Sequence, residues 1–78
     1  MNLSKETVLD AIKKIKPVKY KNHGFIIAWT DIYEHCRNMG FDNSDILNSR
    51  LQQLSSEGYC EIVTEDITYG ITGVRLNS

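Results

Sequence analysis

Few side chains in this 78-residue sequence are of the types that carry out covalent chemistry or bind metals. The soft metal ligands are His23, His35, Cys36 and Cys60. They show neither the Cys-x-x-Cys nor the His-x3-His spacing of a zinc site. The sequence also has no phosphate-binding glycine loop and no nucleophile motif. We therefore expect no metal, no cofactor and no catalytic activity.

A run of lysines is the first group that could bind a partner: Lys13, Lys14, Lys16, Lys19 and Lys21. Clustered cations attract phosphates, and Lys14, Lys19 and Lys21 are our candidate phosphate contacts. Tyr20 lies among them, and an aromatic residue next to basic ones is typical of nucleic-acid surfaces. The alternative is a solvated surface, because cations are favoured at the C-terminal end of a helix.

The second group is a set of amides and hydroxyls on a helix predicted over residues 44–57. Its outer face carries Asn48, Ser49, Gln52, Gln53, Ser55 and Ser56, with Arg50 near the edge. A solvated helix face normally favours Glu and Lys. Asn and Gln amides match the hydrogen-bonding edge of adenine, which favours reading of DNA bases. Packing on a protein partner and plain solvation are the alternatives.

Three helices are expected from the apolar spacing. The first begins at Ser4, whose hydroxyl can cap it, and stops before Pro17. The second begins at Asp31, which forms a capping box with Glu34, and it buries Ile32, Cys36 and Met39. Gly40 ends it. The third is capped by Asn43 or Ser44 and buries Leu47, Leu51 and Leu54.

Strands are expected in two places. Residues 17–24 are expected to be an irregular basic connection, followed by a short buried strand from Phe25 to Trp29. The C-terminal part is expected to be a hairpin, with strands over 59–64 and 67–76 and a turn at Glu65 and Asp66. A bulge at Gly70 or Gly73 would account for the change of phase in the alternation of apolar and polar residues along the second of these strands.

Length and composition indicate one small domain over residues 1–78. The chain is 41% hydrophobic and 24% charged, which is too apolar for intrinsic disorder. The longest apolar run covers only residues 25–29, far short of a membrane span. The polar N-terminus lacks the apolar core of a signal peptide, and two cysteines are few for a secreted domain. We expect a cytoplasmic protein that does not contact a membrane.

The order helix, strand, helix, tight turn, helix and hairpin resembles the winged helix-turn-helix superfamily. The most telling stretch is the leucine-containing helix that ends in Glu57-Gly58-Tyr59 before a strand. The resemblance implies an α+β fold of three helices with a short strand and a C-terminal β-hairpin wing. It also implies a small DNA-binding protein, a transcriptional regulator, that acts on double-stranded DNA.

In that family the third helix commonly enters the major groove, and the wing touches the backbone or the minor groove. Carried over to this sequence, the implied base contacts are Ser44, Asn48, Ser49, Gln52 and Gln53. Arg50 would bind a guanine or a phosphate, and Thr64 and Thr68 would contact the backbone. One such module buries little surface, so a homodimer or a larger protein partner would add affinity.

The charge distribution departs from this pattern. The net charge is −1, but residues 1–39 carry +3 and residues 40–78 carry −4. The half expected to face DNA is therefore the acidic one, and the wing tip is Glu65-Asp66, which would repel phosphates. The alternative function is a protein–protein interaction module that uses this acidic wing to bind a basic partner.

Overall fold

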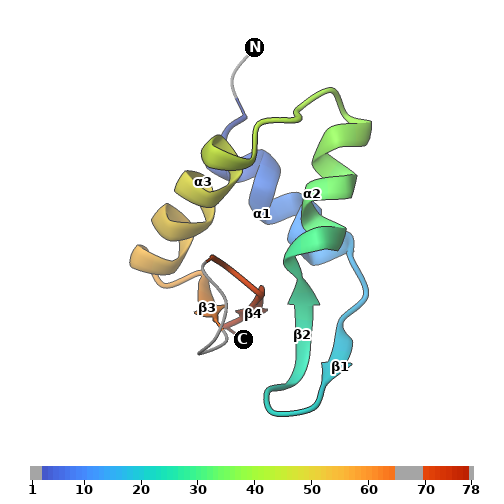
Figure 1. The fold of residues 1–78 in the computed structure, drawn as a ribbon. Coiled ribbons are helices and arrows are strands. Elements are labelled where there is room, and N and C mark those ends of the chain that lie inside the picture. The colour runs from blue at the N-terminus through green and yellow to red at the C-terminus, as the bar shows by residue number, and fades with distance from the viewer. Residues whose placement is uncertain (1–2, 65–69, 78) are drawn as a thin grey trace.

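The computed structural model describes residues 3–64 and 70–77, and over these residues the chain forms three helices and four strands (Figure 1). The elements in chain order are α1 (Lys5–Lys14), β1 (Val18–Tyr20), β2 (Gly24–Ala28), α2 (Trp29–Asn38), α3 (Ser44–Ser56), β3 (Cys60–Val63) and β4 (Gly73–Leu76). All strand pairs are antiparallel, and the order in the sheet is β1-β2-β4-β3. The expected α+β class with three helices is confirmed.

Helix α1 begins as predicted. The Ser4 hydroxyl accepts a hydrogen bond from the backbone N–H of Thr7 at 3.2 Å, which satisfies one of the unpaired donors of the first turn. The helix ends at Lys14, and Ile15 already has extended backbone geometry. This end lies before Pro17, as the steric effect of proline on the preceding residue requires.

The irregular connection predicted over residues 17–24 is wrong, because this segment forms a hairpin with the next strand. Strand β1 pairs with β2 from Val18 opposite Ile26 to Tyr20 opposite Gly24. Gly24 has φ of +71°, the left-handed geometry that closes a three-residue hairpin loop. The loop thus depends on Gly24, which ends a hairpin loop rather than an irregular connection.

Helix α2 begins two residues earlier than predicted, at Trp29, and the proposed capping box at Asp31 is wrong. Ala28 occupies the N-cap position and makes no side-chain cap. The Trp29 N–H instead donates to the Thr72 carbonyl at 2.9 Å. A tertiary contact therefore replaces the local cap. Met39, predicted to be buried, ends the helix and is 44% exposed.

Helix α3 matches the prediction closely. Asn43 is the cap, and its side-chain oxygen accepts from the Ile46 N–H at 3.1 Å. Leu47, Leu51 and Leu54 are almost completely buried. The helix ends at Ser56, one residue before the predicted end.

The predicted C-terminal hairpin forms from shorter strands. Strand β3 pairs with β4 from Cys60 opposite Leu76 to Val63 opposite Gly73. The returning strand was expected from residue 67, but β4 begins only at Gly73. The predicted turn at Glu65 and Asp66 lies outside the described residues. At Gly70 φ is +124°, a value that glycine adopts readily.

Gly73 also joins the two hairpins into one sheet. It lies opposite Ala28, and its neighbour Val74 lies opposite Ile27. A Cβ atom on Gly73 would lie 2.5 Å from the Ile27 carbonyl oxygen and 2.9 Å from Cδ1 of Ile26. Strand β2 can approach this closely only because residue 73 has no side chain.

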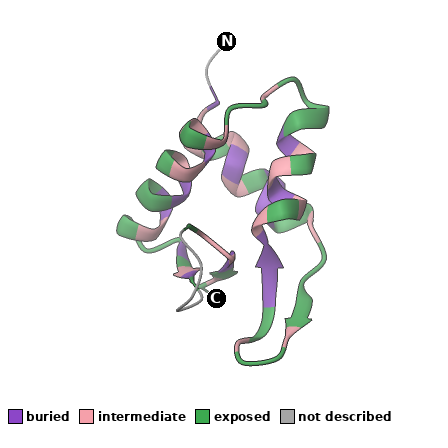
Figure 2. Cartoon of the chain, viewed as in Figure 1, coloured by how far each residue is buried: buried purple, intermediate pink, exposed green. Residues whose placement is uncertain are grey.

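One buried apolar cluster connects the helices with the sheet (Figure 2). It contains Leu3, Val8, Ile12, Ile27, Ile32, Cys36, Leu47, Leu51, Leu54, Cys60 and Val74. Both cysteines are free thiols in this cluster, and burial raises the pKa of each. The prediction that Cys36 is a buried, unreactive residue agrees with this position.

Replacing Gly73 by alanine should destabilise the protein by about 1–3 kcal/mol, because the added methyl group meets the β2 backbone, which cannot rotate away. Urea denaturation followed by circular dichroism measures the change. Thr72→Ala is the control, since the hydrogen bonds of Thr72 with Trp29 and Val63 use its backbone atoms. Equal denaturation midpoints for the Gly73→Ala variant and the native chain would contradict this account.

Stability should fall as the pH rises above about 8.5, where unfolded cysteines ionise but the buried thiols stay protonated. The raised folded-state pKa values mean that the native state then holds more protons than the unfolded state. Urea titrations between pH 7 and about 9.5 test this, with the Cys36→Ala/Cys60→Ala variant as the reference without thiols. Rapid reaction of both thiols with a thiol reagent in the native protein would disprove their burial.

Candidate nucleic-acid interface

The outer face of α3 is open to solvent along its length (Figure 2). Ser49, Gln52 and Gln53, all predicted base contacts, are exposed, whereas Ser44 is half-buried at the first turn. The three leucines turn inward and leave these polar side chains outside. A helix that presents exposed amides and hydroxyls can donate to and accept from a hydrogen-bonding surface.

Asn48, a predicted base contact, forms a side-chain hydrogen bond within the protein. Its side-chain oxygen accepts a hydrogen bond from the indole N–H of Trp29 at 2.7 Å. The Trp29 ring stacks on Tyr33, with centroids 5.1 Å apart and planes 7° from parallel. Asn48 is half-buried and therefore connects α3 to the start of α2, and its side-chain oxygen is engaged by this bond.

Arg50 also has an internal partner. Its Nε donates to the Leu3 carbonyl at 2.7 Å and ties the segment before α1 to α3. At the C-terminal end of α3, the Lys5 ammonium lies 2.6 Å from Oε1 of Glu57. The hydrogen bond to Glu57 raises the pKa of Lys5. Two cations near α3 are thus engaged within the protein.

The turn before α3 is held by backbone and side-chain hydrogen bonds. The Phe41 N–H donates to the Cys36 carbonyl at 2.9 Å, and the Tyr33 hydroxyl donates to the Asp42 carbonyl at 3.0 Å. Gly40 has φ of +96°, as predicted for the end of the second helix. These contacts set the direction in which α3 leaves α2.

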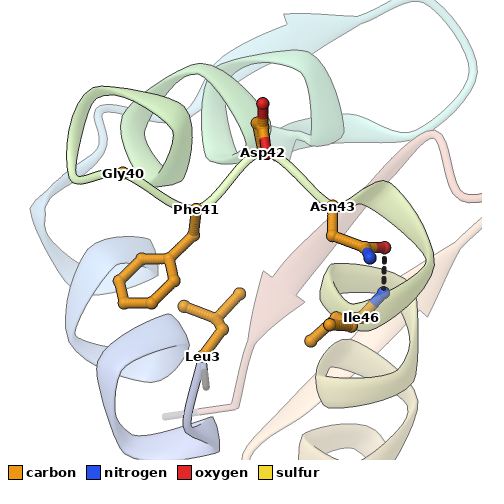
Figure 3. A pocket seen from close by; sticks show the side chains of 6 residues that line it. All are labelled: Leu3, Gly40, Phe41, Asp42, Asn43 and Ile46. Atoms are coloured by element: carbon orange, nitrogen blue, oxygen red, sulfur yellow. Dashed lines mark hydrogen bonds between the residues drawn. The ribbon is translucent and has the colours of Figure 1, made fainter. Parts of the chain in front are cut away.

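A shallow hollow of about 130 Å³ lies beside this turn (Figure 3). Its lining residues are Leu3, Gly40, Phe41, Asp42, Asn43 and Ile46. The Phe41 and Leu3 side chains point toward one another across it, and the Asn43 cap lies at its rim (Figure 3). The hollow is mainly a product of the packing between the N-terminal segment and the turn.

The β3–β4 hairpin contributes one predicted contact that can be placed. Thr64 is exposed directly after β3, whereas Thr68 lies outside the described residues. Across the hairpin, Arg75 lies 3.7 Å from the Glu61 carboxylate and donates to the His23 carbonyl at 2.7 Å. Arg75 thereby bridges the C-terminal hairpin and the loop between β1 and β2.

The structure does not bring the predicted lysine contacts to α3. Lys14 ends α1 and pairs with Asp10 at 2.9 Å. Lys19 is in β1 and Lys21 follows it, at the sheet edge opposite β3. Helix α3 packs against α1 and β3, and Figure 1 shows it on the other side of the molecule from β1. The amide face and the lysines therefore form two separate surfaces.

Sequence reasoning missed the exposure of Phe25. It was expected in a buried strand, yet it is 64% exposed in β2. A hairpin loop that ends at Gly24 could have indicated this exposure. In such a hairpin Ile26 lies opposite Val18, and Phe25 lies opposite Lys19, which is a residue of the solvent-facing side.

Within the described part of the chain, no group of three or more His, Cys, Asp or Glu residues is placed to hold a metal ion. The helices described there are also too short and too polar to cross a membrane.

A comparison with protein-family models, with curated proteins and with solved structures finds no match to this chain.

Replacing Asn48 by alanine should lower the free energy of unfolding by about 0.5–1.5 kcal/mol, because the indole N–H of Trp29 loses its acceptor. Trp29 is the one tryptophan of the chain, so its fluorescence reports on this site directly. We expect a shift of the emission to longer wavelength as water reaches the indole. Gln52→Ala, at an exposed position on the same helix, should leave the spectrum unchanged. An unaltered spectrum in Asn48→Ala would show that the hydrogen bond does not form.

Proposed function

We propose that this chain is a winged helix-turn-helix module that binds double-stranded DNA and acts in transcriptional regulation. The single observation that carries the proposal is the exposed, nearly uncharged face of α3, which follows a tight turn after α2. Strand β2 precedes α2 and pairs with β4, so the C-terminal hairpin and the helices belong to one unit. This arrangement is consistent with α3 as the groove-reading helix and with β3–β4 as the wing.

The residues that would read bases are now a smaller set. Ser49, Gln52 and Gln53 are exposed, and their side chains form no hydrogen bond with another residue in the part of the chain that the structure describes. A glutamine amide can bind adenine in a bidentate way: its NH2 group donates to N7, and its carbonyl oxygen accepts from the N6 amino group. Asn48 and Arg50 instead position α3 through their bonds to Trp29 and Leu3.

Affinity on this face would depend little on charge. Lys5 and Arg50 have partners within the protein, and the lysine run lies on the other side of the molecule. Each phosphate contact contributes about −0.9 to the slope of log affinity against log salt. Few such contacts imply a shallow slope and weak binding by one copy, so a homodimer or a larger protein partner would strengthen it.

The rival function, an acidic wing that binds a basic protein, has less support. Glu65 and Asp66 lie outside the described residues. Of the acidic residues next to and within β3, Glu57 is paired with Lys5 and Glu61 lies near Arg75. Partial neutralisation reduces the attraction that these carboxylates exert on a basic surface. We therefore base the proposal on α3.

Fluorescence anisotropy with duplex fragments from the source genome, at about 50 mM salt, tests DNA binding where electrostatic contacts are strongest. Gln52→Ala should reduce discrimination between sites by about 1–3 kcal/mol for the base pair that it reads. Lys14→Ala is the matched control and should leave duplex affinity unchanged, because Lys14 lies away from α3.

Absence of duplex binding at this salt concentration would overturn the proposal. A loss of affinity in Lys14→Ala together with no effect of Gln52→Ala would place any DNA on the lysine side instead.

A further inference from the structure

The surface formed by the end of α1 and the β1–β2 hairpin holds most of the positive charge of the chain. Five of the nine lysines and arginines fall between residues 13 and 21, and no Asp or Glu occurs between Asp10 and Asp31. Lys14 is paired with Asp10. The other four, Lys13, Lys16, Lys19 and Lys21, are exposed and form no salt bridge within the part of the chain that the structure describes.

An exposed aromatic ring lies within this basic surface. Phe25 lies directly opposite Lys19 in the antiparallel pair, so the two side chains extend from the same face of the hairpin. At 64% exposure, Phe25 is the most exposed of the large hydrophobic residues placed by the structure. A large apolar ring left in water beside cations is more typical of a binding surface than of a core.

A cleft of about 190 Å³ continues from Phe25 into the molecule. It lies next to the two residue pairs that join β2 and β4, Ile27 opposite Val74 and Ala28 opposite Gly73. Pro17, Leu76 and Arg75 also line it. Phe25 therefore lines a hollow whose walls are mainly apolar, with Arg75 as the basic residue in its lining.

The edge of β1 is unsuited to pairing with a strand from another protein or a second copy. Strand β1 has three residues, its central residue is Lys19, and Pro17 precedes it. Short length, lysine and proline are the features by which sheet edges avoid strand addition. A flexible polyanion with flat apolar groups therefore fits this surface better than an extended peptide does.

We propose that the β1–β2 hairpin and the end of α1 form a binding site for single-stranded nucleic acid. A base stacks on Phe25, and the phosphates on either side contact Lys19 and the neighbouring Lys16 and Lys21. Stacking is tolerant of base identity, so this site has little sequence preference. It is separate from α3, and it does not depend on duplex binding by that helix.

The test is fluorescence anisotropy of the full chain with labelled oligo(dT) and oligo(U) of about 15 nucleotides, at about 50 mM salt. Phe25→Ala should weaken binding about tenfold through the loss of stacking. Lys19→Gln should weaken it too and should flatten the salt dependence, since each phosphate contact on a single strand contributes about −0.7 to the slope. The relative affinities of oligo(dT) and oligo(U) show whether DNA or RNA is the better ligand.

Two matched variants separate this site from general effects. Val18→Ala removes an exposed apolar side chain from the opposite face of the same hairpin, as its pairing with Ile26 rather than Phe25 shows; it should not change binding. Gln52→Ala on α3 should alter only duplex recognition. Thermal denaturation of each variant checks that the fold is retained.

The proposal is overturned by any of three results. One is no binding of either oligonucleotide at about 50 mM salt. Another is equal affinity of Phe25→Ala and the native chain. The third is displacement of the oligonucleotide by poly-glutamate as effectively as by unlabelled oligo(dT), because a polyanion without bases would then satisfy the surface completely.

Discussion

The close approach of β2 to β4 at Gly73 is the constraint on which the rest of the structure depends. Only two residue pairs join these strands in the described part of the chain, and one of them includes a glycine with no room for a Cβ atom. Next to this junction, the Thr72 carbonyl accepts the first N–H of α2. The same contact therefore joins the hairpins and sets where α2 begins.

Two further hydrogen bonds fix α3 against the rest of the molecule. Trp29, at the start of α2, donates to Asn48, and Arg50 donates to the carbonyl of Leu3. These bonds join α3 to α2 and to the segment before α1, while the leucines fill the core between them. Polar side chains near α3 thus divide into those that position the helix and those that remain available to a ligand.

The near-zero net charge results from two surfaces of different character. Lysines gather at the β1 edge of the sheet, whereas α3 presents amides and hydroxyls on the other side of the molecule. The first surface suits the phosphates of a nucleic acid of any sequence, and the second suits directed hydrogen bonds to base edges. A small domain can hold both because its single core supports elements on opposite sides.

The sequence by itself determined the features that depend on neighbours along the chain: the cap at Ser4, a cap at Asn43 or Ser44, and the leucine stripe of α3. Such features follow from helical periodicity and from hydrogen bonds that span three residues. The tertiary structure alone decided the roles of Asn48 and Arg50, whose partners lie 19 and 47 residues away. It also decided the exposure of Phe25 and the separation of the lysines from α3, because strand pairing and packing between distant elements place these residues.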